Sequence, residues 1–178
     1  MKAELIKYLE VLINESPPYV YELLLAIFCL GIVMIVIFKS EAVKRSIAKL
    51  LLTEYIALIY SSTVICRNVS IVRKFDYTPF WSYDKADLFM ENIMNVWIFI
   101  PIGLLLGAAI INLRWTKVLA IGCGISISIE FLQLALKRGF SEVDDVMHNT
   151  LGCLIGYSLY CLLRYGYEKL SKWCVAVL

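Results

Sequence analysis

Polar and apolar residues follow one another along this chain in a pattern that predicts helices throughout. Within residues 2–13, aliphatic residues recur at helical spacing between charged ones, which predicts a short amphipathic helix at a membrane interface. Five longer apolar runs follow, each close to the length that crosses a bilayer: residues 19–38, 49–66, 91–111, 115–136 and 149–165. We therefore expect an all-α polytopic membrane bundle of about five transmembrane helices, with an N-terminal interfacial helix.

Composition supports lipid as the main solvent of the chain. Hydrophobic residues make up 61% of the 178 residues and charged residues 18%, and the mean hydropathy is +0.76. This length predicts a single membrane domain over residues 1–178. The net charge of +2 gives no basis for nucleic-acid binding. The six cysteines lie mostly within or beside apolar runs, without a C-x-x-C pair, so we expect packing residues rather than a metal site or disulfides.

Basic residues in the loops indicate the orientation in the membrane. They divide almost evenly between the two sides, but the loop between the first two runs is short and carries Lys39, Lys44, Arg45 and Lys49. By the positive-inside rule this loop lies in the cytoplasm, together with the C-terminus. We therefore expect a multi-pass protein of the cell membrane whose loop at residues 137–148 faces outward.

Polar residues inside the fourth run are the first candidates for chemistry. Ser126, Glu130 and Gln133 lie on one helix face, at positions i, i+4 and i+7. A charged side chain at membrane depth costs about 2.5–3.5 kcal/mol on insertion scales, so such a group marks a site or a structural bond. Two interpretations of Glu130 stay open. It is either a general base or a structural carboxyl bonded to Asn95, Gln133 or Arg138.

The stretch 137–145 packs five charged groups between the last two runs. Asp144 and Asp145 either cap the last helix, where acidic residues are favourable, or hold a group in a site. His148 is the only histidine, and a metal site there is not favoured because a clearer ligand set would be expected. A triad of Ser141, His148 and Asp144 is not favoured either, because no nucleophile turn is present.

Small residues and one proline indicate where the helices pack. Gly122 and Gly124 precede Ser126 by about a turn, and Gly152 and Gly156 form a small-xxx-small face on the last run. In the third run Asn92, Asn95 and Phe99 share a face, and Pro101 predicts a kink with a freed carbonyl.

The loop at residues 67–90 mixes charged and aromatic side chains. We favour an interfacial loop anchored by its rings over a lid or re-entrant segment that shapes a site.

Three ordered motifs resemble the VanZ-like family. The resemblance covers about residues 73–157, with a weaker match at Arg73 and Pro79-Phe80. The motifs are N-x-x-x-F-x-P-x-G at Asn95–Gly103, S-x-x-x-E-x-x-Q at Ser126–Gln133, and R…D-D-x-x-x-N-x-x-G-x-x-x-G-Y from Arg138 through Asp144, Asp145, Asn149, Gly152 and Gly156 to Tyr157. Glu142 and His148 match no fixed residue type of the family, so no role carries over to them.

The resemblance implies a small multi-pass bacterial membrane protein whose family namesake is associated with low-level teicoplanin resistance. It implies no particular reaction and no known cofactor. The first hypothesis is therefore an envelope protein that lowers glycopeptide action, with the lipid bilayer and a glycopeptide or lipid-linked cell-wall precursor as partners. The second is an enzyme acting on a lipid-linked or headgroup substrate, and the third is a small transporter or channel. No oligomeric state is indicated.

We expect seven residues to converge on one polar site at the outer end of the bundle. The candidate catalytic residues are Glu130, Asp144 and Asp145, and the candidate substrate-binding residues are Asn95, Gln133, Arg138 and Asn149.

Overall fold

The computed structural model describes residues 19–67, 69, 74–84 and 86–177. Its helices are α2 (Tyr19–Ile37), α3 (Glu41–Tyr60), α4 (Ala86–Ala109), α5 (Trp115–Leu136) and α6 (Val143–Val177). Shorter elements are the π-helical turn η1 (Ser61–Ile65), the 3-10 turn η2 (Trp81–Asp84) and the strands β1 (Lys74–Asp76) and β2 (Phe140–Glu142). The all-α prediction is confirmed. The predicted interfacial helix at residues 2–13 and Arg73 lie outside the described residues.

The expected long apolar helices are present, with four segments among the described residues long and apolar enough to cross a membrane. These are Glu41–Ile65, Glu91–Ala109, Trp115–Leu136 and Val143–Leu170. The first predicted span forms α2, whose shorter apolar stretch is Ala26–Ile35. Three helices begin well before their apolar runs, among them α4, which begins at Ala86. α3 begins at Glu41 in the polar loop, and α6 begins with its two aspartates in the first turn, where an anion is favourable.

Three glycines bring α4 and α6 into the closest contact of the bundle. A Cβ atom on Gly103 would lie 1.9 Å from the Cys153 carbonyl oxygen, and one on Gly156 would lie 1.9 Å from that of Ile100. Gly152 faces the Val96 carbonyl in the same way. The small-residue face predicted on α6 is therefore a helix-packing surface, as it is in many membrane bundles. α4 continues as a helix through Pro101.

The apolar core lies between α3, α4, α5 and α6. Phe99 and Ile102 of α4, Val118 of α5 and Cys153 of α6 are almost completely buried in it. Gly122 packs against Cys153 as expected, whereas a Cβ on Gly124 would meet nothing within 4 Å. The prediction that both glycines serve close packing is therefore right for Gly122 and wrong for Gly124, which points away from the neighbouring helices.

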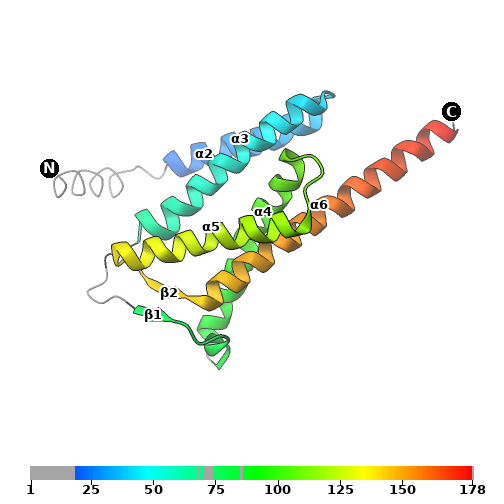
Figure 1. Cartoon of the computed structure of the whole chain (residues 1–178). Helices are drawn as coiled ribbons and strands as arrows, with labels where there is room; N and C mark the ends of the chain where they lie inside the picture. The colour runs from blue at the N-terminus through cyan, green and yellow to red at the C-terminus, as the bar shows by residue number, and fades with distance from the viewer. Residues whose placement is uncertain (1–18, 68, 70–73, 85, 178) are drawn as a thin grey trace.

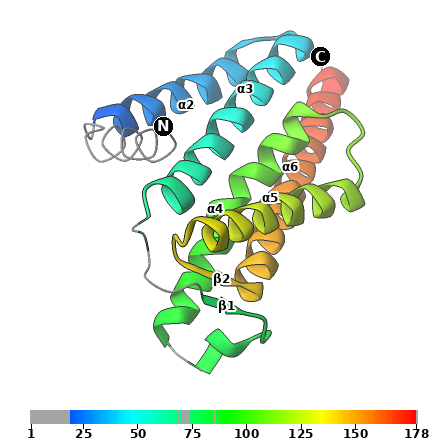
Figure 2. The same cartoon turned by 60° about the vertical axis from the view of Figure 1, so that its left-hand side comes forward.

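Strands β1 and β2 and the beginnings of α4 and α6 lie at one end of the bundle, and the α2–α3 turn lies at the other (Figure 1; Figure 2). The two strands are parallel and pair Phe75 with Ser141. The last part of α6 extends beyond the other helices in Figure 1, and its apolar side chains, such as Leu162 and Leu170, are exposed.

Candidate polar site at one end of the bundle

A tight turn after α5 brings a backbone donor to Glu130. Lys137 ends α5 in the left-handed conformation, and Gly139 has a φ of +113°. The chain reverses here into β2, and the Glu142 N–H donates a 2.9 Å hydrogen bond to Glu130 Oε2. Glu130 is 6% exposed. The expected partners of this carboxyl bond elsewhere: Asn95 to Asp145, Gln133 to Thr63, and Arg138 to the backbone of Ile65 and Arg67.

Asp145 joins the first turn of α6 to α4. Asn95 Nδ2 donates a 2.7 Å hydrogen bond to Asp145 Oδ1. Both residues are half-buried, and Asn95 belongs to the predicted polar face of α4. A carboxylate accepting from an amide in a water-poor region makes a stronger bond than a neutral pair does. This contact fixes the start of α6 against α4 at the level of Glu130.

Asp144 joins the same turn of α6 to the segment between α3 and α4. Its side chain is completely buried, and its Oδ1 accepts a 2.7 Å hydrogen bond from the Phe80 N–H. Phe80 itself has a φ of +64°. The segment 74–84 therefore covers the polar end of the bundle, held by this bond and by the pairing of β1 with β2. The bond to Asp144 fits the lid-like alternative, and the exposed rings of Phe75, Tyr77 and Phe80 fit the favoured interfacial loop, so both interpretations stay open.

His148 has a hydrogen-bond partner at each of its two ring nitrogens. Its Nδ1 lies 2.6 Å from the Asp144 carbonyl oxygen, which can only accept, so Nδ1 carries a proton. Its Nε2 lies within hydrogen-bond distance, 2.7 Å, of the Tyr83 hydroxyl. The histidine is 7% exposed. Within the described residues, no three His, Cys, Asp or Glu side chains are placed to hold a metal ion together.

Asn149 links α6 to α5 one turn further into the bundle. Its Nδ2 donates a 2.9 Å hydrogen bond to Ser126 Oγ. Its Oδ1 is buried and has no hydrogen-bond partner among the described residues. Ser126 is one helical turn before Glu130, and Asn149 is one turn after Asp145, so this unpaired acceptor belongs to the turn that follows the carboxyl groups.

Gln133 and Arg138 bind the end of α3. Gln133 Nε2 donates a 3.1 Å bond to the Thr63 carbonyl oxygen in η1, whose widened turn leaves backbone acceptors available. Arg138 Nη1 donates to the carbonyl oxygens of Ile65 and Arg67, the latter at 2.9 Å. Gln133 lies about 60° around α5 from Glu130, which turns it toward α3. Five of the seven predicted residues therefore gather at the acids, and these two anchor a neighbouring segment.

Two further residues shape the electrostatics of the site. The positive charge of Arg67 acts favourably on the carboxylates of Glu130 and Asp145, and its guanidinium lies against Gly139. Burial, and then the negative charge of Asp145, raise the pKa of Glu142 from 4.5 to about 7. Glu142 thus changes charge near neutral pH.

We use the name polar site for the residues at this end that these bonds and charges connect: Arg67, Asn95, Ser126, Glu130, Glu142, Asp144, Asp145, His148 and Asn149. No sequence motif points to a role for Arg67, Glu142 or His148. Glu142 lies in the charged stretch 137–145, and Arg67 directly follows the apolar run at residues 49–66.

A cavity of about 390 Å³ opens beside the polar site, between α5 and α6. Its walls are mainly apolar, and the carboxyl-bearing residues Glu130 and Glu142 line one part of it. A second cavity of about 510 Å³ lies further along the same two helices and includes His148 and Tyr83. Apolar cavities with a few polar groups are typical of small-molecule sites.

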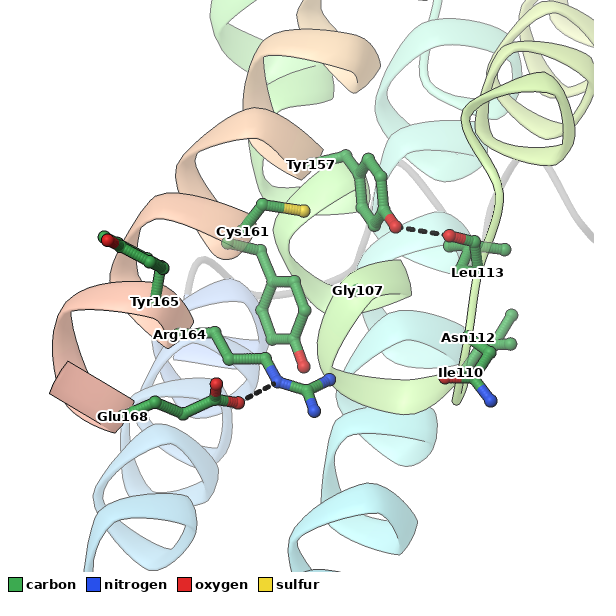
Figure 3. Close-up of a pocket in the computed structure, with 10 residues that line it drawn as sticks. Gly107, Ile110, Asn112, Leu113, Tyr157, Cys161, Arg164, Tyr165 and Glu168 are labelled. Atoms are coloured by element: carbon green, nitrogen blue, oxygen red, sulfur yellow. Dashed lines mark hydrogen bonds and ion pairs between the residues drawn. The ribbon is translucent and has the colours of Figure 1, made fainter. Parts of the chain in front are cut away.

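A third cavity, of about 350 Å³, lies at the opposite end of the bundle (Figure 3). There the Tyr157 hydroxyl donates to the Leu113 carbonyl oxygen, and Arg164 Nε donates a 2.9 Å bond to Glu168 Oε1. The Arg164–Glu168 pair is exposed, so it contributes little to stability. The two dashed lines in Figure 3 mark these two interactions, so the Tyr157 hydroxyl and the Arg164 guanidinium each have a partner within this end of the bundle.

Comparison with known proteins agrees with the motifs. A family model described as VanZ/LLP1 matches residues 23–164, a wider region than the motifs at about 73–157. Protein VanZ from Enterococcus faecium is 34% identical over 90 residues, which are 51% of this chain and 54% of that protein. The match thus spans about half the length of this relative, and no solved structure matches significantly. Because the family model covers most of the chain, and the described helices include four that can cross a bilayer, this chain belongs to the VanZ/LLP1 family of membrane proteins.

Proposed function

We propose that this chain is a multi-pass protein of the bacterial cell membrane that lowers susceptibility to glycopeptide antibiotics such as teicoplanin, and that the polar site is its functional centre. One observation carries the proposal. The family match, residues 23–164, contains every residue of the polar site, from Arg67 to Asn149. The apolar helices support residence in a bilayer, and the similarity to Protein VanZ supports the link to resistance.

The proposed site faces the outer surface, where glycopeptides meet their lipid-linked cell-wall precursor. Burial favours a specific role for its acids, since Glu130 and Asp144 are both less than a tenth exposed in a chain that is otherwise mostly apolar. The Glu130 carboxyl is oriented by the Glu142 N–H, and Glu130 is one of the residues that line the cavity between α5 and α6. Asn95, Asp144 and Asp145 hold that geometry.

The test is expression of the full chain in a glycopeptide-sensitive bacterial host. Cells carrying an unrelated membrane protein at equal membrane abundance are the control for the burden of expression. We expect the chain to raise the teicoplanin concentration needed to stop growth and to lower the amount of labelled teicoplanin bound per cell. If both quantities equal those of the control, the proposed function is wrong.

A second candidate, a membrane enzyme acting on a lipid-linked or headgroup substrate, is favoured by one observation. Glu130 and Glu142 line a cavity whose other walls are apolar and lie at the surface of the bundle. Glu130 would act as the general base, with Asp144 and Asp145 orienting the reacting group. Membranes with and without the chain, incubated with total bacterial lipid, distinguish the candidates. A lipid product that Glu130→Gln abolishes supports the enzyme, whereas identical lipid profiles exclude it for the lipids present.

A further inference from the structure

A fourth cavity, of about 640 Å³, lies at the end of the bundle opposite the polar site. Its walls come from α2, the first turns of α3, the end of α4 and the outer part of α6. It adjoins the cavity of about 350 Å³ shown in Figure 3, because Tyr160 and Arg164 line both. Both volumes lie within the range of small-ligand sites. We use the name basic cavity for the two together.

The basic cavity lies at the level where membrane spans begin and end. The span on α3 begins at Glu41, and the span on α4 ends at Ala109. Glu41 lines the cavity, and so does Ile110, which directly follows α4. Tyr160 and Tyr167 of α6 line it as well, and tyrosine is enriched where hydrocarbon meets water. This is the depth of a lipid headgroup.

Basic side chains outnumber acidic ones around this cavity. Those on the segments next to it, outside α6, are Lys39, Lys44, Arg45, Lys49, Arg114 and Lys117. Three cations line the cavity itself: Lys44, Arg45 and Arg164. Glu41 binds Lys44 at 3.0 Å, and Glu168 binds Arg164 at 2.9 Å, so each of these two charges is balanced by an acid. The charge of Arg45 is left over.

Arg45 is half-buried and has no hydrogen-bond or ion-pair partner among the described residues. Its guanidinium is always charged, and its planar donors match the oxygens of a phosphate in pairs. Arg164 adds further donors. Glu168 binds its guanidinium at Nε, and Figure 3 shows the two terminal nitrogens directed toward α4. The basic cavity therefore offers a surplus positive charge and N–H donors to an anion.

An exposed apolar stripe leads from the basic cavity toward the middle of the bundle. Leu163 lines the cavity, and Leu159 and Ile155 follow it at spacings of four on the same face of α6. All three side chains are exposed. A soluble anion gains nothing from this stripe, whereas an acyl chain lying along it buries apolar surface. Cations at headgroup depth beside an exposed apolar stripe match the two parts of a lipid.

We propose that the basic cavity binds an anionic phospholipid. The headgroup phosphate accepts from the guanidinium groups of Arg45 and Arg164, and one acyl chain lies along the stripe from Leu163 to Ile155. Basic pockets between membrane helices suit such headgroups, and this end is the one that the basic α2–α3 turn predicts to face the anionic cytoplasmic leaflet. The site is separate from the polar site, and its occupant is independent of the proposed resistance.

Native mass spectrometry of the purified full chain tests the proposal. The protein is exchanged from detergent into mixtures of phosphatidylglycerol and phosphatidylcholine with identical acyl chains, and the lipid retained per chain is counted. We expect phosphatidylglycerol to be preferred about fivefold, the effect of one cation near an anionic headgroup. Equal retention of the two lipids by the wild type overturns the proposal.

Excess inorganic phosphate distinguishes a lipid from a soluble anion. A lipid that is held by its acyl chain as well as its phosphate stays bound, and this result supports the proposal. Displacement of the lipid by inorganic phosphate assigns the cavity to a soluble anion and refutes the proposed occupant.

Exchanges of single arginines locate the binding site. Arg45→Gln is expected to remove most of the preference for phosphatidylglycerol, whereas Arg45→Lys keeps the charge and most of the preference. Arg114→Gln is the matched control, since Arg114 is an exposed cation at the same end that belongs to neither cavity wall. The control is expected to keep the wild-type preference. Equal losses in Arg45→Gln and Arg114→Gln would indicate general surface charge and overturn the assignment, as would an unchanged preference in Arg45→Gln.

Discussion

Replacement of Gly156 by alanine tests the packing that positions the polar site. A Cβ at this position would lie 1.9 Å from the Ile100 carbonyl oxygen and 3.0 Å from the Leu104 nitrogen. Both neighbours are backbone atoms of α4, so no side chain can rotate away. To restore ordinary contact distances of about 3.5 Å, the two helices must separate by roughly 1.5 Å along their closest approach.

The expected loss of stability follows from the α4–α6 contacts that this separation breaks. Gly103 and Gly152 belong to the same α4–α6 contact, so their close backbone contacts loosen together with that of Gly156. Overpacking of a well-packed core costs typically 1–3 kcal/mol, and a clash between two helix backbones lies at the upper end, at about 3 kcal/mol. Asn95 and Asp145 bridge the same pair of helices, so their 2.7 Å bond lengthens as well.

Thermal unfolding of the purified protein in detergent, followed by tryptophan fluorescence, measures this loss. Gly166→Ala on the same helix is the matched control, because a Cβ there would meet nothing within 4 Å. The control is expected to be neutral or more stable by a few tenths of a kcal/mol up to about 1, since alanine is the better helix former. Equal midpoints for Gly156→Ala and Gly166→Ala would refute the α4–α6 packing described above.

Two further predictions concern the turn that presents Glu142. Gly139→Ala is expected to destabilise the fold by about 1–3 kcal/mol, because φ is +113° and the new Cβ would lie 2.5 Å from Arg67 Nη1; unchanged denaturant unfolding would contradict this. The second is a pH dependence. Because the folded-state pKa of Glu142 is raised from 4.5 to about 7, its contribution to stability is present below 4.5 and is lost as the pH rises through about 7. Stability measured across this interval should fall with pH less steeply in Glu142→Gln than in the wild type, and identical slopes would rule out the shift.

The helices were predictable from sequence because membrane spans depend on local composition and length. The apolar run at residues 115–136 is α5 with the same bounds, and the run at residues 91–111 is α4, which begins five residues earlier and ends two residues earlier. Helical periodicity likewise placed Ser126, Glu130 and Gln133 on one buried face of α5. The α6 glycines face α4 because close helix contact in a bilayer requires small residues.

The partners of the acids were not predictable, because they depend on contacts between distant segments. Asp144 is bonded to Phe80, 64 positions earlier, and no periodic pattern connects the two. The partner of Glu130 is the Glu142 N–H. It reaches the carboxyl because Lys137 and Gly139, both with positive φ, reverse the chain after α5. Gly124 is a further example. The spacing of Gly122 and Gly124 does not tell which of the two faces another helix, and only Gly122 does.

Teicoplanin susceptibility of cells expressing wild type, Glu130→Gln or Glu168→Gln tests the central claim most directly. Glu168 is the matched control, a glutamate at the opposite end whose ion pair with Arg164 is exposed. All three proteins are compared at equal membrane abundance by immunoblot. If the polar site is the functional centre, wild type and Glu168→Gln confer resistance and Glu130→Gln does not. Equal resistance from all three would make Glu130 a structural carboxyl and contradict the account.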